Sequence, residues 1–205
     1  MKYKSIFDRK VVPGCQDKNA QASRCVSIAP PLREKTYCYG IKMGGDVAFR
    51  KVMDLYLAEN IQLEKDVLRR SLGCHKNTTA LREMMFLALD RNSTFVRLQD
   101  VSDIFVSISK SPIGRKLLFN FLIANWDRIY DGMMSEHESI AEIISAASDG
   151  VRTYQQLEQL KHLKSAGKHA SEFSVFDEVI EESEHRVEWI QKHHGRLIEY
   201  FKKLL

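Results

Sequence analysis

Apolar residues three and four positions apart, repeated in one segment after another, are the feature that most restricts the fold of this 205-residue chain. The clearest segment begins at Pro112, which suits the first turn of a helix because the N–H that proline lacks has no intrahelical partner there. Its apolar side chains share one side of a helix. They are Ile113, Leu117, Leu118, Phe121, Leu122, Trp126 and Ile129. The segment is therefore predicted to be a deeply buried helix.

The same spacing predicts helices through most of the chain, joined by short polar links. Their approximate ranges are 47–58, 63–72, 79–89, 101–109, 140–147, a helix from 153, 173–192 and 198–205. Gly73 is expected to end one of these helices. Thr153 and Gln156 fit a capping box at the start of another, and a helix break is expected before Gly195.

The fold class that follows is all-α, with antiparallel helix pairs stacked as a HEAT/armadillo-like α-solenoid. No strand alternation is present, and no tight sequence repeat is found, so a compact bundle is the alternative. Residues 1–31 contain Pro13-Gly14 and Pro30-Pro31 and keep no apolar period. They are expected to form an irregular lead-in to a helical domain at 32–205.

Charge and hydropathy argue against two classes of partner. The 31 basic and 27 acidic residues give a net charge of +4 and are spread along the chain, so no face is built for nucleic acid. No run approaches the roughly 20 apolar residues that span a bilayer, and no signal-peptide core follows Met1. Taken as a whole protein, the chain is expected to be cytosolic.

The four cysteines point to a different compartment. Cys15, Cys25, Cys38 and Cys74 all lie in the first third of the chain. An even count in one region indicates two disulfides in an oxidising compartment, while four reduced thiols are the equally weighted alternative. Two glycosylation sequons, at Asn77 and Asn92, are mild support for a secreted context.

The sequence lacks the residues of a recognisable active site. His137-Glu138-Ser139-Ile140-Ala141 begins like HExxH, but position 141 is alanine, which has no atom that binds zinc. Gly132-Met133-Met134-Ser135-Glu136 only partly matches GxMEN. His185, Glu188, His193 and His194 are best explained as a solvated helix end. No catalytic or metal-binding residue is predicted, and the chain alone is expected to be inactive.

The order of several landmarks resembles the C-terminal helical domain of the zinc-dependent aminopeptidases typified by aminopeptidase N and the endoplasmic-reticulum aminopeptidases. The resemblance runs from about residue 28 to 203. Its landmarks are Pro31-Leu32-Arg33, Thr36-Tyr37-Cys38, Gly44-Gly45, Phe49 in place of the usual tryptophan, Leu68 to Cys74, Gln99-Asp100, Ser111 to Gly114, Asn125-Trp126, Thr153 to Leu160 and Val187-Glu188-Trp189.

This resemblance implies a division of labour. The catalytic domain of such an enzyme binds zinc, and the helical domain closes over the active-site cavity, where it limits or contacts peptides. The expected partners are that catalytic domain, in the same or another chain, peptides, and a second copy in a homodimer. This chain itself is expected to bind no cofactor. Its location would be extracellular, on the cell surface or in an organelle lumen.

The resemblance also assigns individual residues. It pairs Cys38 with Cys74 and, by analogy, Cys15 with Cys25. It places His75 and Lys76 where some relatives carry a basic residue facing the cavity, so a contact with a peptide carboxylate is expected there. The chain would then be a fragment or truncated form of a larger enzyme, or a mis-predicted gene piece. The alternative function is a free-standing scaffold that binds a protein on its concave face.

Overall fold

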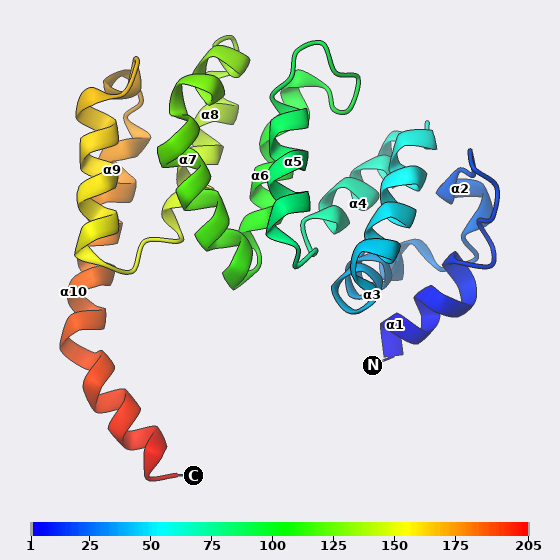
Figure 1. Cartoon of the computed structure of the whole chain (residues 1–205), viewed down its shortest axis with the longest axis horizontal. Coiled ribbons are helices and arrows are strands. Elements are labelled where there is room, and N and C mark those ends of the chain that lie inside the picture. The colour runs from blue at the N-terminus through cyan, green and yellow to red at the C-terminus, as the bar shows by residue number, and fades with distance from the viewer. Residues whose placement is uncertain (1, 205) are drawn as a thin grey trace.

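The computed structural model describes residues 2–204, which form an all-helical chain without a strand in that range. Figure 1 shows the helices side by side, with the two ends of the chain on the same side of the array. No helix within 2–204 combines the length and the apolar character needed to cross a bilayer. The elements are α1 Lys2–Ile6, a π-helical turn Phe7–Val11, α2 Ala22–Cys25, α3 Pro30–Ala58, α4 Gln62–Leu72, α5 Thr78–Ala88, a 3-10 turn Leu98–Asp100, α6 Val101–Ser109, α7 Pro112–Met133, α8 His137–Ser148, α9 Tyr154–Ala166, a 3-10 turn Ala170–Glu172 and α10 Val175–Lys202.

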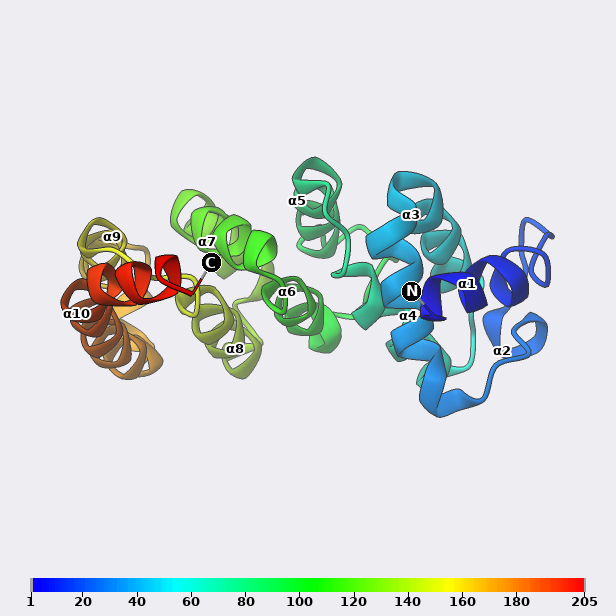
Figure 2. The same cartoon turned by 90° about the horizontal axis from the view of Figure 1, so that it is seen from below.

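The helices lie in two rows. Seen from below, α5, α7 and α9 form one row and α6, α8 and α10 form the other (Figure 2). Within the second row, α6 packs against α4 and α8, and α8 packs against α10. The predicted all-α class is confirmed, and the two rows are compatible with the predicted stack of helix pairs.

Local signals in the sequence fix several helix ends where they were predicted. α7 begins at Pro112, and the Oγ atom of Ser111 accepts a 2.9 Å hydrogen bond from the Gly114 N–H. α9 begins after Thr153, whose Oγ1 atom accepts a 3.2 Å bond from the Gln156 N–H. In return, Oε1 of Gln156 accepts a 2.8 Å bond from the Arg152 N–H and a 3.4 Å bond from the Thr153 hydroxyl. α4 ends at Leu72, and Gly73 is its C-cap residue, as predicted.

The helix predicted at 47–58 is only the second half of α3. α3 extends back to Pro30 and contains one non-helical residue, Gly45, with φ at 61°. The earlier half was missed because three glycines weaken its helical pattern. Gly40 is required there by packing, since a Cβ atom on it would lie 2.4 Å from the ring of Phe7.

The lead-in also has more structure than predicted. Residues 2–11 are helical, and the disulfide of Cys15 with Cys25 closes the loop that follows. Phe7, Val11 and Cys15 are fully buried, so this segment belongs to the core. The apolar residues of this segment are few and extend over only about three helical turns, so their spacing did not reveal a helix in the sequence.

The predicted helix break before Gly195 is wrong. α10 runs without interruption from Val175 to Lys202, and two predicted helices are one. A single glycine in an exposed helix costs about 1 kcal/mol relative to alanine, which is too little to break a helix of this length by itself. Phe176, Val179, Ser183 and Val187 attach only the first half of α10 to the body.

Candidate functional site

A cavity of about 360 Å³ lies where α3, the end of α4 and the turn between α6 and α7 meet. It contains both residues that the sequence indicated as peptide contacts. Its walls are formed by Glu34, Lys35, Cys38, Tyr39, Lys42, Arg70, Ser71, Gly73, Cys74, His75, Lys76, Ser107, Lys110, Ser111, Pro112 and Ile113. We call it the disulfide pocket, because the Cys38–Cys74 bond forms part of its wall.

The disulfide holds two walls of this pocket together. Cys38 lies in the first half of α3 and Cys74 lies just after α4, with their Cα atoms 5.3 Å apart. The second bond joins Cys15 to Cys25. Both pairings are those that the resemblance implies.

The rim of the disulfide pocket is strongly basic. Arg70 is neutralised by Glu34, whose Oε2 atom accepts bonds of 3.1 Å from Nε and from Nη2. Four exposed lysines remain without a carboxylate partner among residues 2–204. They are Lys35, Lys42, Lys76 and Lys110.

The wall of the pocket is apolar by contrast. The Cys38–Cys74 sulfurs, the ring of Tyr39, Pro112 and the half-exposed side chain of Ile113 supply carbon and sulfur surface. A ligand with an apolar group and a carboxylate matches this combination, because the apolar part leaves water while lysines pair with the charge.

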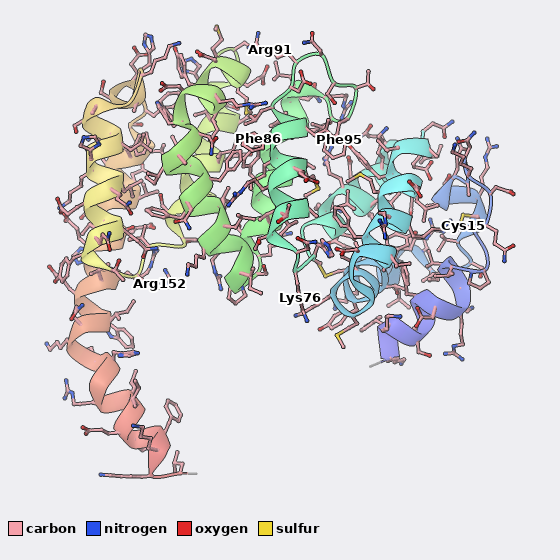
Figure 3. All side chains as sticks on the ribbon, in the orientation of Figure 1. Cys15, Lys76, Phe86, Arg91, Phe95 and Arg152 are labelled. Atoms are coloured by element: carbon pink, nitrogen blue, oxygen red, sulfur yellow. A yellow bond between two sulfur atoms is a disulfide. The ribbon has the colours of Figure 1, made fainter. Side chains whose placement is uncertain are left out.

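The two residues expected to contact a peptide are placed differently. Lys76 is exposed at the rim, and Figure 3 shows it at the lower edge of the array, between α5 and α3. His75 is 3 % exposed, and its Nε2 atom lies 2.8 Å from Oδ1 of Asp46. Its ring stacks on Phe49, with centroids 4.5 Å apart. His75 therefore anchors the chain after Cys74 to α3, while Lys76 is available to a ligand.

Asp46 joins this anchor to the first sequon. Its Oδ1 atom also accepts a 3.1 Å bond from Nδ2 of Asn77. Hydrogen bonds from Asn77 and His75 hold the pKa of the Asp46 carboxyl below its ordinary value. Asn77 in turn caps α5, because its Oδ1 atom accepts from the Thr79 and Ala80 N–H groups. Asn92, the second sequon, is exposed in the loop before α6.

The residues present do not fit a zinc ion. Within residues 2–204, no three histidine, cysteine, aspartate or glutamate side chains converge as a metal site, and all four cysteines are oxidised. His137 begins α8 with its ring 5.2 Å from that of Phe173. No chemical step is therefore derived from a metal in this chain.

The sequence did not reveal the other lysines of the disulfide pocket. Lys35 and Lys42 lie on the half of α3 that was not recognised as helical, and Lys110 lies at the end of α6. The spacing of Lys35, Tyr39 and Lys42 is that of one helix face and was the available signal.

Comparison with known proteins gives consistent matches over nearly the whole chain. The family model of the ERAP1-like C-terminal domain matches residues 4–188. Aminopeptidase N of Haemonchus contortus is 48% identical over 202 residues, which cover 98% of this chain and 21% of that protein. Aminopeptidase N of Canis lupus familiaris is 25% identical, covering 94% of this chain and 20% of that protein. An aminopeptidase-like protein of Caenorhabditis elegans is 26% identical, covering 97% and 18%. The chain spans about a fifth of the length of these curated relatives.

Proposed function

The chain belongs to the family of ERAP1-like C-terminal domains, and from this premise we propose that it is the non-catalytic helical domain of an aminopeptidase. Its task is to cover the active-site cavity of the catalytic domain and to contact peptides that enter it. The partner is the catalytic domain, in the same or another polypeptide, and zinc belongs to that partner.

The observation that carries the peptide contact is the disulfide pocket with its four unpaired lysines. A peptide whose first residue is held at a distant catalytic centre still has a free carboxylate at its other end. Lys76 and Lys110 both line the pocket, so both are expected to approach one carboxylate there, and the apolar wall accepts the last side chain.

The two disulfides support a location on the oxidising side of a membrane, because such bonds persist outside the cytosol. We therefore propose an extracellular, cell-surface or lumenal site for the protein. Exposed Asn77 and Asn92 are proposed to carry glycans there.

The experiment is a titration of the chain with one fluorescent peptide in two forms, with a free C-terminal carboxylate and with a C-terminal amide. The free acid is expected to bind about tenfold more tightly, because one charge-assisted bond contributes about 1.5 kcal/mol. K76A/K110A should remove that difference. K18A is the matched control, since Lys18 is exposed in the loop closed by Cys15 and Cys25, outside the pocket.

Equal affinity for the two peptides would refute the carboxylate contact. So would a K76A/K110A variant that keeps the preference of the unmodified chain. Binding of neither form would refute a peptide-contact role for the isolated domain.

A further inference from the structure

The two glycosylation sequons lie at opposite ends of α5. Asn77 is the N-cap residue of this helix, and Asn92 lies in the loop that follows it. The 11 residues of α5 separate the two positions by about 16 Å along the helix axis. Figure 3 shows Lys76, the neighbour of Asn77, at the lower edge of the array and Arg91, the neighbour of Asn92, at the upper edge. Glycans on the two asparagines would therefore cover different surfaces.

Asn77 lies at the edge of the disulfide pocket. The preceding residue, Lys76, is part of the pocket wall, and the Cα atoms of consecutive residues are about 3.8 Å apart. Nδ2 of Asn77 donates a 3.1 Å hydrogen bond to Oδ1 of Asp46. The same oxygen lies 2.8 Å from Nε2 of His75, which also lines the pocket. A single carboxylate therefore links the nitrogen that would carry a glycan to a wall residue of the pocket.

The side chain of Asn77 has a fixed direction. Its Oδ1 atom accepts bonds of 3.0 Å and 3.4 Å from the Thr79 and Ala80 N–H groups, and its Nδ2 atom is bonded to Asp46. The amide nitrogen carries two hydrogens, and a glycan replaces only one of them. The cap and the bond to Asp46 are thus compatible with glycosylation, so the first sugar begins at a defined place beside the pocket.

We propose that a glycan on Asn77 narrows the mouth of the disulfide pocket and limits the length of the peptides that the pocket accepts, a gate that rests on the proposed peptide contact. The donor of the glycan is a lipid-linked diphosphate oligosaccharide. A bond forms between Nδ2 and C1 of the first sugar, and the bond from that carbon to the diphosphate breaks. The amide proton is released, and the lipid diphosphate is the leaving group.

The dependence on peptide length follows from the exposure of Lys76 at the rim of the pocket. A peptide whose last residue enters the pocket leaves it across the rim on its way to the catalytic domain. A glycan is bulky, and on Asn77 it occupies the space next to this rim. A short peptide ends within the pocket and avoids the glycan, whereas a long peptide has to share the rim with it.

Asn92 has no comparable relation to the disulfide pocket. Its neighbours Asp90, Arg91 and Ser93 line a separate cavity of about 260 Å³. None of these three residues lines the disulfide pocket. A glycan on Asn92 therefore provides a control of the same chemistry at the other end of α5.

Each sequon can be removed without changing its asparagine. Thr79 contributes only its backbone N–H to the cap of α5, and the side chains of Thr79 and Thr94 are exposed. T79A leaves a sequon at Asn92 alone, and T94A leaves one at Asn77 alone. The two variants form a matched pair, because each is expected to carry one glycan at one end of the same helix.

The test compares T79A and T94A of the 205-residue chain, both secreted from insect cells, with glycan occupancy measured by mass spectrometry. Each is titrated with a short and a long fluorescent peptide that share the same C-terminal residue and free carboxylate. The long peptide should bind T94A about tenfold more weakly than T79A, which corresponds to the loss of a few contacts at the rim. The short peptide should bind both variants equally, which also shows that both are folded. Enzymatic trimming of the T94A glycan to its first sugar should restore most of the affinity for the long peptide.

The outcomes separate this gate from the peptide contact itself. Equal binding of the long peptide to the two variants would overturn the gate and leave the contact intact, provided that T79A prefers the free acid to the amide. A T94A chain without sugar on Asn77 would also overturn the gate. Loss of affinity for the short and the long peptide alike would show a local change of the pocket in place of a limit on length. A T79A chain without preference for the free acid would refute the peptide contact, and the gate would fall with it.

Discussion

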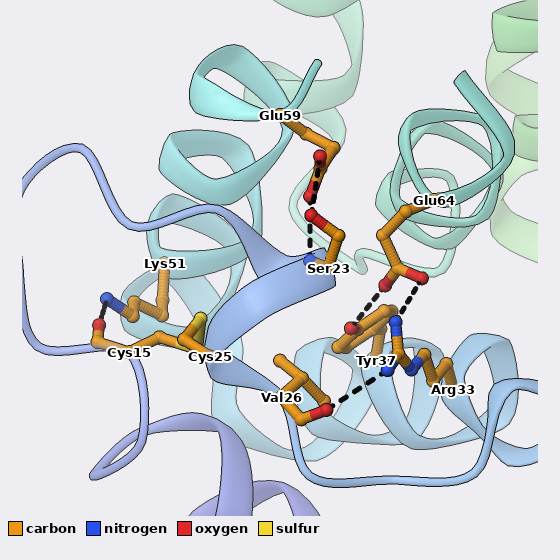
Figure 4. Close-up of a disulfide and its surroundings, with 9 residues drawn as sticks. All are labelled: Cys15, Ser23, Cys25, Val26, Arg33, Tyr37, Lys51, Glu59 and Glu64. Carbon is orange, nitrogen blue, oxygen red and sulfur yellow. Dashed lines mark hydrogen bonds and ion pairs between the residues drawn. A yellow bond between two sulfur atoms is a disulfide. The ribbon is translucent and has the colours of Figure 1, made fainter. Parts of the chain in front are cut away.

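The hydroxyl of Tyr37 donates a 2.6 Å hydrogen bond to Oε1 of Glu64, which joins α3 to α4 inside the core (Figure 4). Arg33 donates from Nη1 to the other oxygen of the same carboxylate, also at 2.6 Å. The guanidinium also reaches the carbonyl oxygens of Val26 and Ile28. A single buried carboxylate thus fixes the start of α3 against α4 and the segment that precedes α3.

Replacing Tyr37 by phenylalanine tests this relationship. The change leaves Oε1 of a buried carboxylate without its donor, so Y37F should lower the free energy of unfolding by about 1–3 kcal/mol. The measurement is urea unfolding followed by circular dichroism. Y39F is the control, because Tyr39 lies two residues away on α3 with its side chain 45% exposed, and it should change stability little. Equal effects of the two changes would contradict the role of the buried bond.

Most helices were predictable from the sequence because their apolar periods and end signals agree. α6 begins and ends at the predicted residues, and Pro112, Thr153 and Gly73 mark ends where expected. The first half of α3 was not predictable, since Gly40 looks like a helix breaker until Phe7 is known to pack against it. At Gly195 the sequence predicted a helix break that the structure does not have. No neighbouring side chain packs against this glycine, so only its low helix propensity opposes the helix there.

The candidate site was only partly predictable for a geometric reason. Lys76 was identified through its position after Cys74, but Lys35, Lys42 and Lys110 come from segments that meet only in the fold. The burial of His75 depends on Phe49 and Asp46, more than 25 positions earlier.

The two disulfides should contribute unequally to stability. Cys38–Cys74 spans 36 positions and Cys15–Cys25 spans 10. In the chain-entropy model, loops of these lengths correspond to about 4 and about 3 kcal/mol. C38S/C74S should therefore lower the free energy of unfolding by about 1 kcal/mol more than C15S/C25S. Urea unfolding of both variants checks the order, and the reverse order would contradict it.

Glu59 should make stability depend on pH in the acidic range. Burial raises the pKa of its carboxyl, but hydrogen bonds from the Ile61, Ser23 and Asn60 N–H groups outweigh this and leave it below the ordinary 4.5. A depressed folded-state pKa contributes stability that is complete above the unfolded-state value and is lost as pH falls through the folded-state value.

The free energy of unfolding should thus fall as pH drops below about 4.5, where the unfolded chain binds a proton first. E59Q should be less stable at neutral pH by about 1–3 kcal/mol, because it loses charge-assisted bonds. It should also show a shallower decline in acid. E83Q, at an exposed position on α5, serves as the control and should keep the slope of the unmodified chain. An E59Q slope equal to that of E83Q would argue against the carboxylate as the titrating group.

Replacement of Gly40 by alanine should destabilise the protein, whereas replacement of Gly195 by alanine should stabilise the helix that contains it. A Cβ atom at Gly40 would lie 2.4 Å from buried Phe7, so G40A should force the π-helical turn Phe7–Val11 away from α3 and lower the free energy of unfolding in urea by about 1–3 kcal/mol. Gly195 has open space around it, so G195A should favour helix in α10 by about 0.5–1 kcal/mol. Because the second half of α10 has no buried residue and opens separately from the core, this gain should appear as about two- to fivefold slower amide hydrogen exchange in residues 188–202. Faster exchange in G195A would contradict the role of helix propensity at Gly195. An unchanged free energy of unfolding in G40A would contradict the packing of Phe7 against Gly40.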